Sequence, residues 1–331
     1  MPNHDAYTVG WICALPIEYV AAQEFLDEEH EGLDFMEQND NNIYTLGRIG
    51  KHNVVVASLP LGQYGLVSAA NVARDMVRSF ANIRVGLMVG IGGGVPSQNH
   101  DIRLGDVVVS AAGLSNGGVF QYDYGKTVQN KEFVTTGFLN QPPQLMLSAV
   151  GNLKAIYKRK GNQLEDSVTK LLHNNPRLQD DYQRPDSSTD KLYVSSFTHA
   201  GGDNACCSAT VEDDESTIIL RKLRGVYEDN PAIHYGLIAS ANQLMKDAVV
   251  RDRLAAEKNV LCFEMEAAGL MNHFPCLVVR GICDYSDTHK NKLWQGYAAM
   301  TAAAYAKDFL NTIVPSKIEA ERKLSEVLSD G

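Results

Sequence analysis

Apolar runs of four to eight residues recur along the chain and are separated by stretches with helical periodicity. Runs that are apolar at every position are typical of strands in a sheet that helices cover on both faces. The runs lie at residues 7–14, 43–49, 54–59, 85–91, 107–110, 233–240, 260–263 and 276–279. The polar link at 50–53 predicts a hairpin between the second and third runs.

The amphipathic stretches predict helices at 16–28, 66–80, 245–258 and 294–314, with helical pieces near 143–158 and 166–173. Pro16 suits the first turn of a helix, which also holds Glu18. Strands that alternate with helices predict an α/β domain, residues 7–314, in which helices flank a central mixed sheet in three layers. The pattern loosens at 115–232, where polar residues 174–191 predict an exposed insertion, and 315–331 are predicted to be a polar tail.

The stretch 259–284 places charge directly after two apolar runs. The run 260–263 is followed by Glu264, Met265 and Glu266, and the run 276–279 is followed by Arg280 and then Asp284; a short helix is predicted between them. Ligands of open α/β sheets bind outside the carboxyl ends of the strands. Charge at buried strand ends is costly unless it is paired or functional. This stretch is therefore the candidate site.

The run 85–91 ends in a glycine cluster, Gly90-Ile91-Gly92-Gly93-Gly94. Glycines after a strand let the backbone approach a ligand closely, but they also make tight turns. The pattern is neither GxGxxG opening a helix nor a phosphate-binding loop with GK[ST]. The residues alone leave both interpretations, ligand loop and tight turn, open.

Composition narrows the function classes. The 331 residues carry a formal net charge of −10, which argues against nucleic acid or an anionic membrane as the main partner. No apolar run approaches the roughly 20 residues that span a bilayer, and no signal peptide is recognisable. The six Cys are scattered, which predicts reduced thiols in a cytoplasmic protein, and no role follows for Cys206-Cys207. No metal site is predicted, because neither the cysteines nor His199, His273 and His289 have the spacing of metal ligands.

Five motifs together resemble the nucleoside phosphorylase/nucleosidase superfamily. They are ALPIE at 14–18, GIGGG at 90–94, LGDVV at 104–108, FEMEAA at 263–268 and VRGICD at 279–284. The superfamily includes hexameric purine nucleoside phosphorylases and methylthioadenosine/S-adenosylhomocysteine nucleosidases, and the chain looks most like its fungal branch. The resemblance covers roughly 7–112 and 233–314, leaves 115–232 poorly matched, and implies a purine nucleoside ligand, no metal or organic cofactor, and a homo-oligomer, a dimer or higher.

The resemblance also implies roles for individual residues. Glu266 matches the glutamate that holds the ribose 2′ and 3′ hydroxyls, and Met265 matches the methionine that packs on the sugar. Asp284 matches the aspartate that protonates purine N7, and Arg280 matches an arginine near the nucleophilic water. Further implied substrate contacts are Gly92, Tyr124 in the sugar-contacting loop, Leu244 where the family usually has phenylalanine, Met245, and Trp294 as a substitute for the missing aromatic ring.

Glu18 distinguishes two chemistries within the superfamily. Phosphorylases have a phosphate-binding arginine at this point, and nucleosidases have a glutamate that activates water. A phosphate beside an ionised carboxylate is disfavoured, because like charges at ~4 Å repel by about 4 kcal/mol at an effective dielectric constant of 20. Ile91, where phosphorylases place a phosphate-binding serine, agrees. The hypothesis is a purine nucleosidase with Glu18 as base, Asp284 as acid and Arg280 assisting.

Simpler alternatives remain open at this point. Glu266 and Glu18 could be acids that favour a helix N-terminus. Glu264 is expected to be structural, paired with a basic residue, whereas Arg280 and Asp284 could pair with each other. The charges at 289–292 are expected on a solvated loop. A phosphorylase, a methylthioadenosine-type nucleosidase and a non-catalytic nucleoside sensor are the alternative functions.

Overall fold

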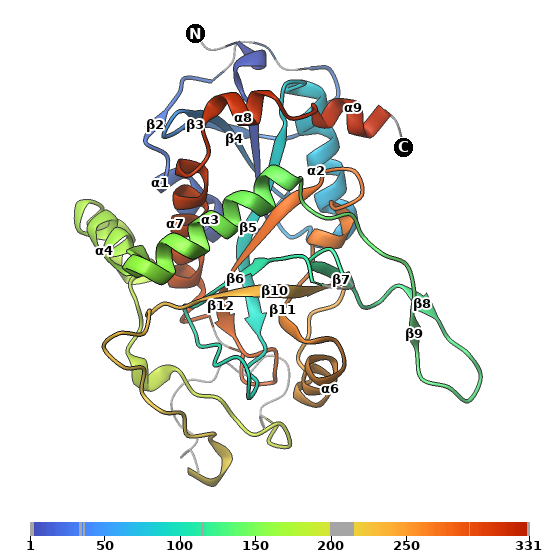
Figure 1. Cartoon of the computed structure of the whole chain (residues 1–331), viewed down its shortest axis with the longest axis vertical. Helices are drawn as coiled ribbons and strands as arrows, with labels where there is room; N and C mark the ends of the chain where they lie inside the picture. The colour runs from blue at the N-terminus through green and yellow to red at the C-terminus, as the bar shows by residue number, and fades with distance from the viewer. Residues whose placement is uncertain are drawn as a thin grey trace.

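The computed structural model describes residues 3–32, 35, 37–113, 116–198, 215–290 and 292–329. Its centre is a ten-stranded mixed sheet in the order β11-β10-β6-β12-β5-β1-β4-β3-β2, with β7 paired to β10. The strands are β1 (Val9–Cys13), β2 (Glu28–Glu29), β3 (Tyr44–Ile49), β4 (His52–Ser58), β5 (Val85–Gly94), β6 (Val107–Ser110), β7 (Val119–Gln121), β10 (Ile233–Ser240), β11 (Val260–Glu264) and β12 (Cys276–Asp284). A separate hairpin pairs β8 (Gly125–Lys126) with β9 (Val134–Thr135) and projects from the body (Figure 1).

Helices cover both faces of the sheet, which confirms the predicted α/β class (Figure 1). They are α1 (Pro16–Glu24), α2 (Leu66–Ser79), α3 (Gln144–Lys160), α4 (Leu164–Asn174), α5 (Gln179–Tyr182), α6 (Ala248–Lys258), α7 (Gln295–Asn311), α8 (Pro315–Glu319) and α9 (Leu324–Ser329). Alanines on α7 allow this helix to lie close to β5 and β12, and α1, α4 and α5 pack against α7 in turn. No helix within the described ranges is long and apolar enough to span a membrane.

Parallel and antiparallel strand pairs meet next to the candidate site. Strand β12 runs parallel to β5, whereas β11 runs antiparallel to β5 and pairs with its last residues, Gly93 and Gly94. Because β11 also pairs with β10, the strands β11, β10, β6, β12 and β5 close into a ring. The charged ends of β11 and β12 therefore approach the same part of β5 from opposite directions.

The glycine cluster is strand rather than loop or turn, so both interpretations of it are corrected. Strand β5 continues to Gly94 because its backbone bonds to β12 on one side and to β11 on the other. The missing side chains make room for neighbours: a Cβ on Gly90 would stand 2.3 Å from Oε1 of Glu18 and 2.7 Å from Nη1 of Arg280. The cluster thus admits charged side chains to the interior of the sheet.

The segment 174–191 is mostly exposed, as its polarity predicts, but it is anchored to the body of the domain. Tyr182 at the end of α5 is buried, and its hydroxyl donates to the carbonyl of Ile17 at 3.3 Å. The backbone also approaches α7 closely, since a Cβ on Gly296 would lie 1.9 Å from the carbonyl oxygen of Asp181. One buried tyrosine among polar neighbours is enough to fix the segment against α7.

A pair of glycine substitutions tests the packing of α7 on the site strand. A Cβ on Gly281, between Arg280 and Asp284, would lie 1.8 Å from the carbonyl oxygen of Ala298 on α7. Gly281→Ala should therefore lower the free energy of unfolding by at least ~1–3 kcal/mol, because rigid backbone must shift. The control Gly151→Ala, in α3 with no atom within 4 Å of the new Cβ, should raise it by roughly 0.5–1 kcal/mol. Equal effects in denaturant unfolding would contradict the close contact.

Both ends of the described chain lie at the amino ends of β1 and β5. The side-chain amide of Asn82 donates to the carbonyl of Asp5 at 2.7 Å. At the other end, the amide of Leu324 donates to the carbonyl of Ile83 at 2.8 Å, just before β5 begins. The two terminal segments therefore meet the same loop, residues 81–84.

Candidate functional site

Arg280 lies at the centre of a buried cluster of charged side chains. Its side chain is fully buried, and Nη2 forms an ion pair with Glu264 and a longer contact of 3.4 Å with Oε2 of Glu266. The apolar pattern predicts that Arg280 follows the end of a strand. It lies inside the strand instead, because β12 continues to Asp284. The carboxylates of β11 and the following turn replace solvent around the guanidinium.

Glu264 is structural and paired with a basic residue, as expected from the sequence. Besides its ion pair with Arg280, its carboxylate accepts the backbone N–H groups of Glu266 at 3.0 Å and of Ala267 at 3.0 and 3.2 Å. These bonds shape the turn from β11 into a short 3₁₀ helix, Ala267–Gly269. Glu264 thereby fixes the backbone that carries Glu266.

Glu266 reaches from this turn to the beginning of α2. Its Oε1 accepts the backbone N–H of Gly65, the N-cap residue of α2, at 3.3 Å. The side chain of Asn242 accepts the next N–H, that of Leu66, at 3.0 Å. The structure thus places Glu266 against the N-terminus of α2, whereas it makes no capping bond to the 3₁₀ helix that follows it. The contact fixes one carboxylate oxygen and leaves the other beside Arg280.

Glu18 enters the same cluster from α1. Its Oε2 accepts the backbone N–H groups of Ala14 at 2.7 Å and Leu15 at 2.9 Å, and its Oε1 accepts that of Ile91 at 2.7 Å. The residue is 3% exposed. Because a carboxylate offers about four acceptor positions, three N–H donors leave roughly one, on Oε1.

Burial and crowding shift the ionisation of these carboxyl groups. Burial raises the pKa of Glu18, against the opposing effects of Arg280 and of the three backbone N–H groups. Burial raises the pKa of Glu266 to about 7; Arg280 opposes the rise, and Glu264 and Glu18 add to it. Three carboxyl groups share one guanidinium, so the cluster accommodates a proton near neutral pH more readily than a further negative charge.

Asp284 ends β12 and lies close to the last glycines of β5. Its Oδ1 accepts the backbone N–H of Ser286 at 2.8 Å, and its Oδ2 forms an ion pair with Nζ of Lys290 at 3.0 Å. The alternative of an Arg280–Asp284 pair is therefore wrong. A Cβ on Gly93 would lie 2.8 Å from Oδ1 of Asp284 and 2.0 Å from Oγ of Ser286, so a side chain here would displace both.

Of the remaining predicted contacts, Met265 and Gly92 lie beside the charged cluster, and Met245, Leu244 and Tyr124 differ in burial. Met265 is half-buried in the turn between Glu264 and Glu266, and Gly92 lies in β5 with Cys262 packed against its Cα. Met245 is buried in a small apolar cluster, while Leu244 beside it is 53% exposed. Tyr124 is 60% exposed before the projecting hairpin.

Trp294 lies away from the charged cluster. Its indole N–H donates to the hydroxyl of Thr189 at 3.0 Å, and its ring packs edge-to-face on Tyr297. With 1% of the residue exposed, the indole offers no free face for a purine in this structure.

The stretch 240–245 is held by Tyr122 and Asp123, two residues of the poorly matched middle segment. Asp123 accepts the backbone N–H of Asn242 at 2.9 Å, and the hydroxyl of Tyr122 donates to the carbonyl of Gln243 at 3.0 Å. Tyr122 also stacks edge-to-face on Phe263 of β11. Tyr122 and Asp123 thus position the stretch that carries Leu244 and Met245, two of the implied substrate contacts.

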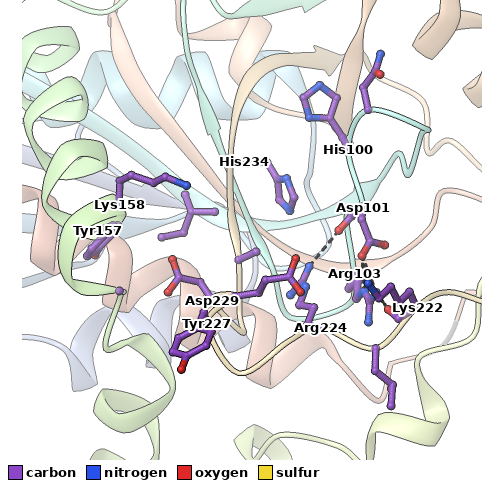
Figure 2. A pocket seen from close by; sticks show the side chains of 16 residues that line it. His100, Asp101, Arg103, Tyr157, Lys158, Lys222, Arg224, Tyr227, Asp229 and His234 are labelled. Atoms are coloured by element: carbon purple, nitrogen blue, oxygen red, sulfur yellow. Dashed lines mark hydrogen bonds and ion pairs between the residues drawn. The ribbon is translucent and has the colours of Figure 1, made fainter.

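A polar cavity of about 560 Å³ lies beside β6 and β10, and none of the predicted site residues line it (Figure 2). Beneath it, Asp106 accepts hydrogen bonds from Arg224 at 2.6 Å and from His234 at 3.0 Å. These two partners outweigh burial and hold the pKa of Asp106 below its usual value. The aspartate of the LGDVV motif is thus a structural tie between β6 and the segment that leads into β10.

Lys290 is the residue of the site that sequence reasoning missed. The charged run at 289–292 predicts a solvated loop, but the side chain of Lys290 is 19% exposed and contacts Asp284. The sequence contains no signal for this contact, since it depends on the path of the loop after β12.

Comparison with known proteins places the fold. No protein-family model matches the chain. A nucleotide-binding leucine-rich repeat (NLR)-like protein of Hyaloscypha variabilis is 44% identical over 318 residues, which make up 96% of this chain and 30% of that protein. The chain thus spans about 30% of the length of this curated relative.

Two solved structures share the architecture over nearly the whole chain. The futalosine hydrolase of Helicobacter pylori has a TM-score of 0.56 and 15% identity, covering 94% of this chain and 100% of its own. A 5′-methylthioadenosine/S-adenosylhomocysteine nucleosidase from Neisseria meningitidis, in complex with methylthio-immucillin-A, has a TM-score of 0.56 and 15% identity, covering 92% and 99%. The chain therefore has a mixed α/β fold of the nucleoside phosphorylase/nucleosidase type.

Proposed function

We propose that the chain is a nucleosidase that hydrolyses the N-glycosidic bond of purine nucleosides such as adenosine or inosine, giving free base and ribose. The observation that carries the proposal is the buried cluster of Glu18, Glu264, Glu266 and Arg280. It has more carboxylates than cations and contains a group that can take a proton near neutral pH. Such an environment suits a water nucleophile better than a phosphate.

Glu18 activates the water in this proposal. The free acceptor position on Oε1 is where a water can donate a hydrogen bond, and the raised pKa makes the carboxylate a better base at neutral pH. Nε of Arg280 is a buried donor with no hydrogen-bond partner among the described residues. Buried donors are nearly always satisfied, so this atom is suited to hold the same water or the sugar.

Glu266 and Asp284 act on the two halves of the substrate. Ionised Glu266 accepts from the ribose 2′ and 3′ hydroxyls through the oxygen that does not face Gly65. Because its pKa is about 7, sugar binding tightens as the pH rises through neutrality. Asp284 delivers a proton to purine N7, which makes the base a better leaving group as the sugar becomes oxocarbenium-like. Water then attacks from the face opposite the base and inverts the anomeric carbon.

A phosphorylase of the same fold is less well supported. A phosphate dianion would need to displace or neutralise carboxylates that Arg280 already pairs with. A 5′-substituted nucleoside such as methylthioadenosine fits the same chemistry, and the two solved relatives with nucleosidase or hydrolase names favour cleavage by water over phosphate.

A second candidate is a nucleoside-sensing module without turnover. It is favoured by the NLR-like relative, in which the matching region is a minor part of a longer protein. A sensor needs Glu266 for binding, but it has no need for a buried carboxylate with a raised pKa at the position of Glu18. The two candidates therefore differ in turnover rather than in affinity.

Product analysis separates these functions. The chain is incubated with adenosine, inosine, guanosine and methylthioadenosine, each with and without phosphate. We expect free base and ribose, or its 5′-methylthio derivative, at equal rates in both conditions. Ribose 1-phosphate that forms only with phosphate would establish the phosphorylase, and saturable binding without cleavage would establish the sensor.

A further inference from the structure

We propose that Lys290 is a positioning residue that fixes Asp284 and supplies the proton which Asp284 passes to the purine. This inference rests on the proposed nucleosidase function. It starts from the 3.0 Å ion pair between Nζ of Lys290 and Oδ2 of Asp284, whose side chains are 19% and 10% exposed. Such a largely shielded ion pair is not explained by solubility or by surface charge.

The pair poses a chemical problem for Asp284 alone. An ionised carboxylate only accepts hydrogen bonds, and N7 of a neutral purine is also an acceptor. Asp284 already accepts from the ammonium of Lys290 at Oδ2 and from the backbone N–H of Ser286 at Oδ1. A proton must therefore reach the carboxylate before it can reach the base.

The ammonium of Lys290 is the nearest source of that proton. When the substrate excludes water, the proton moves along the hydrogen bond from Nζ to Asp284 and leaves a neutral amine beside a neutral carboxyl group. The carboxyl O–H then protonates N7 while the electron pair of the breaking C1′–N9 bond goes to the purine. Water loses its proton to Glu18 as its oxygen bonds to C1′, and Lys290 regains a proton from solvent after product release.

The loop that carries Lys290 is held from several directions. The ring of His289 stacks on Tyr193 and on Phe197, with ring centroids 3.9 Å and 5.2 Å apart, and these two rings also contact each other. Nη1 of Arg251 donates to the carbonyl of Tyr285 at 2.7 Å and lies 4.0 Å from Asp287. A lysine side chain loses rotamer entropy when it is fixed, so a loop that is already held in place makes the contact with Asp284 less costly.

The middle segment of the chain also contributes to this scaffold. Besides Tyr193 and Phe197, Asp190 accepts a hydrogen bond from the hydroxyl of Tyr285, and Arg221 pairs with Asp190 at 2.9 Å. The groups that face Lys290 are Asp284 and Cys283 of β12 and Asp287 of the loop, with Cys262 of β11 close by. Asp284 is the carboxylate within hydrogen-bond distance of Nζ, which makes it the acceptor of the proton.

The test uses substrates that differ in their need for a proton. Adenosine requires protonation of its base, whereas 7-methylguanosine already carries a positive charge on the base and can leave without it. Lys290→Met should lower kcat for adenosine by roughly 10²–10³-fold and leave kcat for 7-methylguanosine within about fivefold. The control Lys292→Met, an exposed lysine of the same loop, should change neither.

Two further readouts separate proton supply from a structural role. Lys290→Met should abolish the basic limb of the adenosine pH profile that reports loss of the proton from Lys290. The double variant Asp284→Asn/Lys290→Met should be no slower than Asp284→Asn, since Lys290 acts through Asp284. Thermal unfolding of each variant shows that it is folded.

The outcomes are distinct. Equal losses on both substrates, or unchanged kcat on adenosine, would overturn the role of Lys290 while the nucleosidase function stands. If the unmodified chain cleaves neither substrate, the nucleosidase function fails and this inference fails with it.

Discussion

Replacing Glu18 by glutamine should lower kcat for purine nucleoside hydrolysis by roughly 10²–10⁴-fold, the usual contribution of a general base. Glutamine keeps the size of the side chain but cannot take a proton from water. KM should change much less, because in the proposed mechanism Glu18 contacts the nucleophile rather than the nucleoside. Initial rates of ribose release over a range of adenosine concentrations measure both quantities.

The same substitution should also have a measurable cost in stability. Three backbone N–H groups point at the carboxylate of Glu18, and the amide group of glutamine would face at least one of them with a donor. A loss of about 1–3 kcal/mol in the free energy of unfolding is expected for such a buried mismatch. Glu24→Gln, in the same helix but only partly buried, is the control and should retain activity. A kcat within about threefold of the unmodified protein for Glu18→Gln would exclude it as the base.

Arg280→Met should have the largest effect on stability. The guanidinium is fully buried and is paired with Glu264 and Glu266. Removing one partner of a buried ion pair leaves uncompensated charge and typically lowers the free energy of unfolding by about 3–5 kcal/mol. Chemical denaturation at about pH 8 should show this loss together with loss of turnover.

The loss should depend on pH in a defined direction. Burial raises the pKa of Glu266 from 4.5 to about 7, and Arg280 is the main group that opposes this rise. Without Arg280 the pKa of the folded state rises further. A carboxyl group with a raised folded-state pKa contributes stability that is fully present below its unfolded pKa and is lost as the pH rises through the folded pKa. Arg280→Met should thus be least destabilising near pH 5 and most destabilising above about pH 8.

A double variant checks the cause. In Arg280→Met/Glu266→Gln one of the two unpaired carboxylates is removed, so part of the stability at about pH 8 should return. A penalty of the same size at all pH values, with no recovery in the double variant, would show that Arg280 stabilises the fold through packing rather than charge.

The sequence predicts the elements well where one physical requirement dominates. Apolar runs become β1, β4, β5, β11 and β12, because strands covered on both faces must be apolar. Pro16 begins α1 and Leu66 begins α2, as the helical pattern indicates. Glu264 pairs with a basic residue as expected, since a buried carboxylate needs a partner.

The sequence fails where tertiary pairing overrides local preference. Glycine favours turns, yet Gly92, Gly93 and Gly94 belong to β5 because two neighbouring strands bond to their backbone. Arg280 interrupts an apolar run, yet it lies inside a strand, because the closing ring brings Glu264 to it. No local pattern reports that β11 runs against β5, and this direction decides which charges meet.

The position of the chain ends bears on how this domain can be joined to others. The terminal segments meet at residues 81–84, where β5 begins, whereas Glu18, Arg280 and Asp284 gather along the residues where β5 ends. A neighbour tethered to either end would therefore leave from the side of the sheet remote from the carboxylates. A neighbour at the C-terminal end could still influence the site through α9 and α2, because α9 packs on α2 and the N-cap residue of α2, Gly65, donates to Glu266.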